Sequence, residues 1–467
     1  MSATATKPGG RGALGQAATY AIGLALSKST GLLLLPLVTH ALSPEDYGRL
    51  EFLQSFISAG TVIAGTWLVE TLFRFASAPE EEGRRAAAEV TGLSLTIALA
   101  LLAFFLAGAP LLSAALPVGA STIEVVLAGG VVAAEAMNIV PLGWLRMRNQ
   151  ARRWAVLMTA RMVGHLALTA ILLWAGCGVA GVLAAGVIAS LAVGCIQVAA
   201  QAREGGIAFT PRAWRPFIVY GAPLTVNGLA MFALNSADLW FLAGWVPTAQ
   251  LGLYALAIKL ALIAQIATQP FDLWWHPRRQ MVVQEQNGIA KTARLAGFGA
   301  ALALICAAGV AVAGPVLLRA LTPPAYHAAS LLLPWMAGAL AIQHLGSMVN
   351  VGCYLGNKGT EAGAVNLTAA VAVVVLYLLL IPVFGMAGAV AATIVAQFFR
   401  MLLFGVLSLR RLAAPYPFRA IAVLAAACAM TAALPQVIAS PVWGTAAGLL
   451  AFAGCLLLAA LLRLTPS

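Results

Sequence analysis

The chain has 467 residues, of which 62% are hydrophobic and only 9% are Asp, Glu, Lys or Arg. Soluble proteins carry about 25% charged residues, and a soluble fold of this length could not hide so much apolar side chain from water. Together with a mean hydropathy of +0.94, this composition predicts an all-α polytopic membrane protein. It excludes large domains outside the membrane and most soluble enzymes. Because the apolar stretches are continuous rather than alternating, it also argues against an outer-membrane β-barrel.

The formal net charge is +12. In a soluble protein this charge would suggest nucleic-acid binding, but in a membrane protein basic residues mark the cytoplasmic loops, so no nucleic-acid partner is expected. The six cysteines lie in or beside apolar segments and form no CxxC pair. We therefore expect neither a disulfide framework nor a metal site. No Walker A loop or other catalytic motif stands out, and we predict no cofactor and no enzymatic activity.

In chain order, the tail 1–13 is rich in Gly, Pro, Thr and Ala and is predicted to be disordered on the cytoplasmic side. After it we count runs of about 20 mostly apolar residues, the length that crosses a bilayer. There are about 14 such expected transmembrane helices: 14–38, 50–75, 90–112, 122–145, 155–174, 179–200, 217–241, 251–274, 293–316, 329–353, 364–382, 386–408, 420–436 and 443–462. The first is too long for a cleavable signal peptide and lacks a cleavage pattern.

The basic residues give the orientation. Of the 27 Lys and Arg residues, 20 fall in the N-terminal tail, in the even-numbered loops or at the C-terminus. Only Arg49 and Arg319 fall in odd-numbered loops, and five lie within spans. Because basic loops stay in the cytoplasm, this asymmetry predicts cytoplasmic N- and C-termini and an even number of spans.

An internal repeat is present. The segment Gly178–Ala185 (GVAGVLAA) reappears 207 residues later as Gly385–Ala392 (GMAGAVAA). Three further matches lie at offsets of 203 to 208: Leu111, Leu112 and Pro117 with Leu317, Leu318 and Pro323; Pro44 and Gly48 with Pro247 and Gly252; and Asn149 with Asn357. Four matches in the same order at nearly one offset indicate a true repeat.

The repeat predicts the domain organisation. Its offset covers six spans, an even number, so both copies share one orientation. We expect an N-lobe (14–200), a cytoplasmic linker (201–216), a C-lobe (217–408) and an extra helix pair (420–462). Parallel repeats related by a pseudo-two-fold axis along the membrane normal are typical of transporters, whose substrate site lies between the lobes near the midplane.

Charged residues inside spans are the candidate site, because each costs at least about 2.5–3.5 kcal/mol near a helix centre on insertion scales. Such residues face a cavity or a partner. The candidate substrate-binding cations, with one histidine, are Lys28, Arg161, His165, Lys259 and Arg400. The candidate acids for ion coupling or pairing are Glu70, Glu135 and Asp238.

Alternatives stay open for each candidate. Lys28 and Lys259 could pair with an acid such as Asp238 or Glu70, or contact substrate. Arg161 and His165, four residues apart on one helical face, would suit a phosphate group, because Arg binds phosphate in a bidentate manner. A carboxyl group removed from water can hold a proton near neutral pH, so Asp238 and Glu135 could couple transport to an ion, or pair with cations.

Several segments resemble one protein family. Ser27–Gly48 (SKSTGLLLLPLVTHALSPEDYG) is similar to the opening helix and first outer loop of Wzx-type O-antigen and exopolysaccharide flippases, which belong to the multidrug/oligosaccharidyl-lipid/polysaccharide (MOP) exporter superfamily. Tyr220–Asp238 resembles the start of their second lobe and Gly252–Lys259 the following helix. Val365–Pro382 and the turn after it resemble their eleventh and twelfth helices. The similarity covers most of residues 14–410.

The resemblance implies a MATE/MOP-like fold and a lipid-linked oligosaccharide as substrate, carried on undecaprenyl pyrophosphate across the inner membrane by alternating access. Membrane lipids, a polysaccharide polymerase and glycosyltransferases are the other implied partners. Three alternatives remain: a lipid II-type flippase, a MATE-like drug or cation antiporter, and a membrane glycosyltransferase or polymerase. The antiporter would favour acid-rich, cation-poor lobes, and the enzyme would need catalytic acids and a sizeable outer loop.

Overall fold

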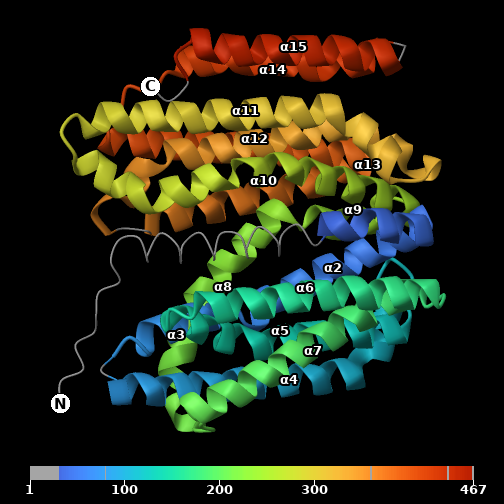
Figure 1. The fold of residues 1–467 in the computed structure, drawn as a ribbon, viewed down its shortest axis with the longest axis vertical. Helices are drawn as coiled ribbons and strands as arrows, with labels where there is room; N and C mark the ends of the chain where they lie inside the picture. Colours follow the sequence, from blue (N-terminus) through green and yellow to red (C-terminus); the bar gives the residue numbers. More distant parts are fainter. Residues whose placement is uncertain (1–30, 79, 358–359, 439–440, 465–467) are drawn as a thin grey trace. The chain divides into compact units, whose positions relative to one another are not determined.

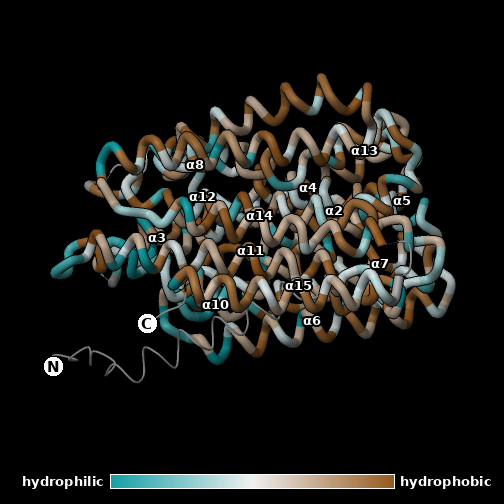
Figure 2. The backbone as a smooth tube through the Cα atoms, turned by 90° about the horizontal axis from the view of Figure 1, so that it is seen from above, coloured by the Kyte–Doolittle hydropathy of each residue, from teal (hydrophilic) through white to brown (hydrophobic). Residues whose placement is uncertain are grey.

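The chain is described here by a computed structural model that covers residues 31–464 except 79, 358–359 and 439–440. Every regular element in these ranges is a helix (Figure 1). Apolar residues fill most of the helical length, and the hydrophilic segments gather toward helix ends and loops (Figure 2). Most of the expected first span, with Lys28, lies outside the described residues; its last part is the short apolar helix Gly31–Ala41.

The chain divides into two compact units. Unit 1 holds the chain up to Leu37 and Phe56–Leu229, and unit 2 holds Val38–Ser55 and Ala230–Ser467. The division therefore falls within three helices, Gly31–Ala41, α2 (Pro44–Ala64) and α8 (Arg215–Asn235), rather than in the expected linker. It follows packing rather than repeat boundaries, so the two expected lobes stay a prediction.

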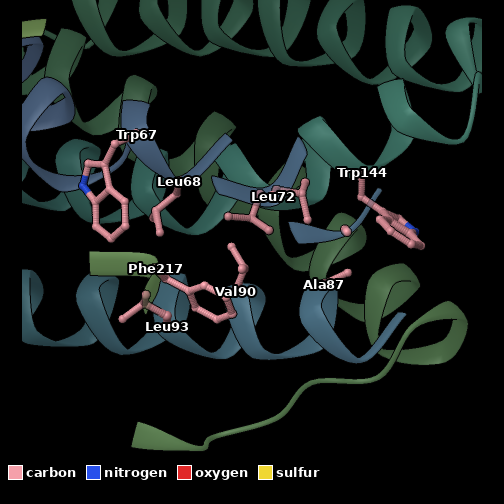
Figure 3. Close-up of a cluster of buried hydrophobic side chains, with 10 residues drawn as sticks. Trp67, Leu68, Leu72, Ala87, Val90, Leu93, Trp144 and Phe217 are labelled. Atoms are coloured by element: carbon pink, nitrogen blue, oxygen red, sulfur yellow. The ribbon is translucent and has the colours of Figure 1, made fainter. Parts of the chain in front are cut away.

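Unit 1 is a helical bundle. It contains the second part of α2 (Pro44–Ala64), α3 (Thr66–Phe75), α4 (Glu80–Ala115), α5 (Thr122–Met147), α6 (Ala151–Trp174), α7 (Gly178–Glu204), the 3-10 turn η1 (Pro211–Ala213) and most of α8 (Arg215–Asn235). Figure 3 shows a cluster of its buried hydrophobic side chains, in which Leu68 and Leu72 of α3 meet Val90 of α4 and Phe217 of α8. Membrane helices associate through such close van der Waals packing.

Local sequence signals explain where α5 begins. The Ser121 hydroxyl accepts a hydrogen bond from the Glu124 backbone N–H at 3.3 Å, and the Glu124 carboxylate accepts one from the Ser121 N–H at 2.7 Å. This reciprocal capping box satisfies two backbone donors that the first helical turn would otherwise leave free. Glu124 is thus an acid that serves the helix end.

Unit 2 contains the remaining helices. They are α9 (Asp238–Ala243), α10 (Thr248–Gln284), α11 (Gly288–Leu321), η2 (Pro324–Leu331), α12 (Leu333–Val349), η3 (Val351–Asn357), α13 (Thr360–Arg411), α14 (Phe418–Val437) and α15 (Pro441–Leu461). Helices α10 to α13 pack against one another, and the pair α14–α15 packs against α11 (Figure 1).

Helix α13 is a hairpin of two antiparallel arms. Gly385 interrupts its helical dihedrals with φ 53° and ψ −128°. Glu361 and Arg411, at its two ends, form an ion pair, and Tyr377 hydrogen-bonds Thr393 at 2.9 Å. In a straight helix Glu361 and Arg411 would lie about 75 Å apart. The arms therefore correspond to two expected spans, 364–382 and 386–408.

The expected number of 14 spans is approximate. The described residues contain 11 helices long and apolar enough to cross a membrane, or 12 if the bent pair η2–α12 is one span. One of these is the α13 hairpin, which holds two expected spans. Another is the broken helix Pro44–Phe75, which begins six residues earlier than expected because Ser43 caps it: the Ser43 hydroxyl accepts from the Asp46 N–H at 3.1 Å.

The repeated turn has the same backbone in both copies. Gly178 and Gly385 have φ values of +54° and +53°, a region that residues with a side chain rarely adopt. Three residues on, Gly181 and Gly388 lie against the preceding helix, where a Cβ would meet Leu172 and Leu380 respectively. The sequence repeat thus encodes one turn geometry twice.

Two further repeat-matched glycines contact each other inside unit 2. A Cβ on Gly48 would meet the Thr248 carbonyl and the Gly252 nitrogen, and a Cβ on Gly252 would meet the Pro44 carbonyl and the Gly48 nitrogen. Helices α2 and α10 therefore cross with their backbones in contact. The contact is reciprocal at an offset of 204 residues, which is the pattern of a local two-fold axis.

Candidate functional site

Arg161 and Glu135 form an ion pair in unit 1. The Arg161 guanidinium on α6 bonds Glu135 on α5 through both carboxylate oxygens, with Nη1 3.2 Å from Oε2. The Ser190 hydroxyl on α7 donates to Glu135 Oε1 at 3.4 Å. The side chains are about one quarter exposed, 25% for Arg161 and 23% for Glu135. Three helices thus meet at one polar group that lies within the expected spans.

His165 lies one turn beyond Arg161 on α6. Its Nε2 is buried and has no hydrogen-bond partner among the described residues. It stands close to α7, because a Cβ on Gly186 would lie 3.7 Å from this nitrogen. Arg161 and His165 do share a helical face, but Arg161 already pairs with Glu135, so a phosphate at this point would compete with that carboxylate.

Glu70 lies in a stripe of exposed polar residues on α3. Thr66, Glu70 and Arg74 follow at intervals of four residues and are all exposed. The Arg74 guanidinium lies over the Tyr220 ring, 4.4 Å from its centroid. Charged side chains within an apolar span normally face a bundle interior or a water-filled cavity rather than lipid. This stripe is therefore a candidate cavity wall of unit 1.

Lys259 pairs with an acid that the sequence did not single out. Its ammonium group on α10 donates to Glu51 on α2, and it lies 5.6 Å from the Tyr47 ring centroid. The Glu51 side chain is only 7% exposed. The expected partners were Asp238 and Glu70. The expected span begins at residue 50, so Glu51 was placed at its edge and not among the acids within spans.

Asp238 begins the short helix α9. Its carboxylate accepts hydrogen bonds from the Tyr254 hydroxyl at 2.7 Å and from the Leu239 N–H at 2.9 Å. The side chain is buried, and no basic residue among those described pairs with it. A buried carboxylate with neutral donors only is the chemistry expected of a group that binds a cation or a proton.

Arg400 is the most buried of the candidate cations that the structure describes, at 6% exposure. It lies on the second arm of α13. Its Nε donates to the Asn366 side-chain carbonyl at 2.9 Å and its Nη1 to the Gln397 side-chain carbonyl at 3.3 Å. The Phe404 ring lies 5.3 Å below it. Within the described chain no carboxylate pairs with this guanidinium, so its positive charge is oriented but not neutralised.

The candidates thus form separate groups. Arg161, Glu135 and His165 lie together in unit 1, whereas Lys259, Asp238 and Arg400 occupy three different places in unit 2. A common cationic cavity that includes Lys28 stays a prediction.

One further polar cluster was not anticipated. Asp272 lies 3.7 Å from His276 on its own helix and 3.6 Å from His344 on α12. The described residues hold no group of His, Cys, Asp or Glu arranged to bind a metal ion. Asp272 and His276 are four residues apart, so their proximity on one helix can be predicted from the sequence. Their contact with His344 cannot, because it depends on how α10 and α12 pack.

Comparison with known proteins identifies the family and the fold. Residues 15–271 match the family described as polysaccharide biosynthesis protein. No curated protein matches the chain. The structure of a lipid II flippase MurJ in an inward closed conformation aligns with a TM-score of 0.74 at 11% identity, covering 95% of this chain and 98% of that one.

Two other solved structures show the same architecture. An inward-facing multidrug resistance MATE transporter of the MOP superfamily aligns with a TM-score of 0.62 at 17% identity, covering 83% of this chain and 95% of that one. A MOP superfamily transporter from Pyrococcus furiosus aligns at 0.55 and 16% identity, with 85% and 96% covered. At these identities the likeness concerns the fold. Since the family match covers more than half of the residues, the chain belongs to the polysaccharide biosynthesis protein family, and its fold is that of the MurJ and MATE structures.

Proposed function

We propose that the protein is a flippase that moves a lipid-linked oligosaccharide, carried on undecaprenyl pyrophosphate, across the bacterial inner membrane. The observation that carries this proposal is Arg400. Its guanidinium is buried in an apolar helical hairpin, is held in place by Asn366 and Gln397, and has no acid beside it among the described residues. An unneutralised Arg is costly in a membrane unless an anion binds there, and a pyrophosphate supplies that anion.

The rest of the proposal follows from the fold and the charges. The family match supports a role in polysaccharide synthesis. The exposed polar stripe on α3, Thr66, Glu70 and Arg74, offers the sugars a hydrated surface. Alternating access between two lobes, 14–200 and 217–408, would expose Lys28, Lys259, Arg161 and Arg400 in turn. Both termini lie in the cytoplasm in this proposal, and a polymerase with glycosyltransferases would supply and consume the substrate. Asp238 is the proposed ion-coupling acid.

A lipid II-type flippase is the second candidate, because the MurJ structure aligns over nearly the whole of both chains. Its substrate carries the same pyrophosphate, so Arg400 fits both. A MATE-like antiporter of drug cations is supported less well, because Arg400 would repel a cation. The fold comparison supports transport rather than catalysis for all three.

The test uses purified protein in proteoliposomes. The probe is undecaprenyl pyrophosphate that carries one fluorescent N-acetylhexosamine, and movement is measured as loss of fluorescence to an impermeant quencher. We expect wild type and Arg400→Lys to move the probe and Arg400→Met to lose movement. Arg410→Met, which removes an exposed charge from the end of the same hairpin, is the matched control.

Four outcomes separate the candidates. Faster transport of the fluorescent N-acetylhexosamine probe than of lipid II supports the first proposal, and the reverse supports the second. Normal transport by Arg400→Met would contradict the proposal that Arg400 binds the pyrophosphate. Movement of a lipophilic drug cation without movement of either lipid would refute both flippase proposals.

A further inference from the structure

A polar stripe runs along the buried face of α7 in unit 1. Ser190, Gln197 and Gln201 are spaced by seven and four residues, which places them on one side of the helix. All three are buried, with Gln197 only 3% and Gln201 only 2% exposed. They face α5 and α6, whose residues line the same pocket. A membrane helix has no structural need for two buried glutamines one turn apart.

The two glutamines lack hydrogen-bond partners. Both the nitrogen and the oxygen of each side-chain amide are buried without a partner in the described residues, and so is the indole N–H of Trp144 on α5. Exchanging the amide nitrogen and oxygen would not help, because neither atom of either amide is satisfied. Buried polar groups are nearly always hydrogen-bonded, so these five atoms indicate an occupant that both donates and accepts.

There is space for such an occupant. A small pocket, with room for about one water molecule, lies between α5, α6 and α7 and is lined by Trp144, Leu157, Gln197 and Gln201 among others. At its end Arg153 and Glu204 form an ion pair of 2.9 Å, and both side chains are partly exposed. On the orientation proposed above, this end lies at the cytoplasmic surface. Because Arg153 is already neutralised, the pocket offers no free charge to an anionic head group.

The polar groups continue from the pocket toward the membrane midplane. Asn138 of α5, fully buried, donates to the Ser190 carbonyl at 2.9 Å, while its own side-chain oxygen has no partner in the described chain. Opposite it stands Gly194, whose missing Cβ would lie 3.0 Å from that oxygen. The Ser190 hydroxyl then reaches Glu135. The stretch from Gln201 to Ser190 is about 16 Å long, roughly half the hydrocarbon thickness.

We infer that the seam between α5, α6 and α7 is a water-filled passage from the cytoplasmic surface to the Glu135–Arg161 pair. Its ligands are water molecules and the protons that they relay. Water fits because it donates and accepts at once and needs two to four polar partners, which the two amides, the indole and Asn138 provide. The groups that bond Glu135 are Arg161 and Ser190, and His165 lies one turn further along α6 than Arg161. The inference does not depend on the lipid-linked substrate.

The experiment measures solvent access along α7 with Ag⁺, a thiol-reactive cation small enough to follow a file of waters. In a background without the six native cysteines, single cysteines replace Gln201, Gln197 or Ser190 in inside-out vesicles. The matched control is Leu191→Cys, whose side chain lies beside Ser190 in sequence but is 41% exposed on the apolar surface. After Ag⁺ exposure, the thiols that remain are counted with maleimide after denaturation.

We expect Ag⁺ to block the cysteines at 201, 197 and 190 in that order of rate, and all of them faster than the cysteine at 191. Equal rates at 190 and 191 would overturn the inference. A second variant keeps the test decisive if a cysteine perturbs packing: Gln197→Leu with Gln201→Leu should abolish the Ag⁺ reaction of Ser190→Cys. Gln265→Leu, an exposed amide on α10, should leave it unchanged. An undiminished reaction in the double variant would refute a passage through this seam.

Discussion

Three basic side chains in this protein show two ways of holding a positive charge within an apolar helix. Arg161 and Lys259 each have a carboxylate beside them, and Arg400 has two side-chain carbonyls instead. A paired charge is neutral as a unit, whereas amide carbonyls orient a guanidinium without removing its charge. This difference decides which side chains are free to meet an anionic substrate and which are fixed by their partners.

The Lys259–Glu51 pair gives a prediction about stability. Removing Lys259 as Lys259→Met leaves the Glu51 carboxylate buried and unpaired, and breaking a buried pair in this way costs about 3–5 kcal/mol. The reverse change, Glu51→Gln, should cost less because the Lys259 side chain is 26% exposed and can reach water. A thermal unfolding assay in detergent measures both. If the double variant is as unstable as the sum of the two single variants, the two residues do not interact.

A second prediction at this scale concerns Glu135. In Glu135→Gln the Arg161 guanidinium loses its counter-charge but keeps a hydrogen-bond acceptor. A partly buried cation would then be left unpaired, so we expect a loss of stability of about 1–3 kcal/mol. The combined change Glu135→Gln with Arg161→Gln should recover much of it. No recovery in the double variant would show that the pair is not what holds α5 to α6.

At the scale of elements, the glycines decide where helices turn and cross. Gly385 lies in the turn of the α13 hairpin at positive φ, and its repeat partner Gly178 has the same dihedral. We expect Gly385→Ala and Gly178→Ala to destabilise the protein by similar amounts, about 1–2 kcal/mol each, the cost of a left-handed residue with a Cβ. Gly363→Ala, on the first arm of the hairpin with open space at its Cβ, is the control. Unequal costs at 178 and 385 would argue against an equivalent turn.

The crossing of α2 and α10 gives another prediction. Because a Cβ on Gly252 would meet backbone atoms of α2, Gly252→Ala must force the two helices apart. We expect a loss of at least about 1–3 kcal/mol, the usual cost of overpacking. Gly338→Ala on α12, where nothing lies near the added methyl group, should be neutral or slightly stabilising. Equal melting temperatures for the two variants would show that the crossing adapts without strain.

Much of this level could be predicted from the sequence. Hydropathy located the apolar helices, because every span must satisfy its backbone internally and present apolar side chains to lipid. The expected spans 364–382 and 386–408 already predicted a break at the turn of the α13 hairpin. The sequence could not predict the partner of Lys259, since Glu51 lies 208 residues away and their meeting is a matter of packing. The sequence did not indicate a role for Gln197 and Gln201, because next to Arg203 they look like the polar end of a span.

At the scale of the whole molecule, the distribution of basic residues predicts the topology. With cytoplasmic termini, a green fluorescent protein fused after Ser467 should fluoresce, and alkaline phosphatase fused there should be inactive. Alkaline phosphatase inserted in the loop near Gly119, between α4 and α5, should be active because that loop faces outward. The opposite pattern would invert the orientation and move the end of the α7 passage to the outer surface.

The reciprocal contact of Gly48 with Gly252 has the two-fold pattern of an interface between two identical chains, but both sides of it belong to one chain. Between two identical chains, every change at such an interface occurs twice, so an ion pair across it would be formed either twice or not at all. Within one chain the two sides can differ. Shifting Glu51 and Lys259 by the same 204 residues leads to Ala255 and Ser55, so the charged pair has an uncharged counterpart. The covalent link between the repeats thus permits one lysine and one glutamate where a symmetric dimer would have had to hold two of each.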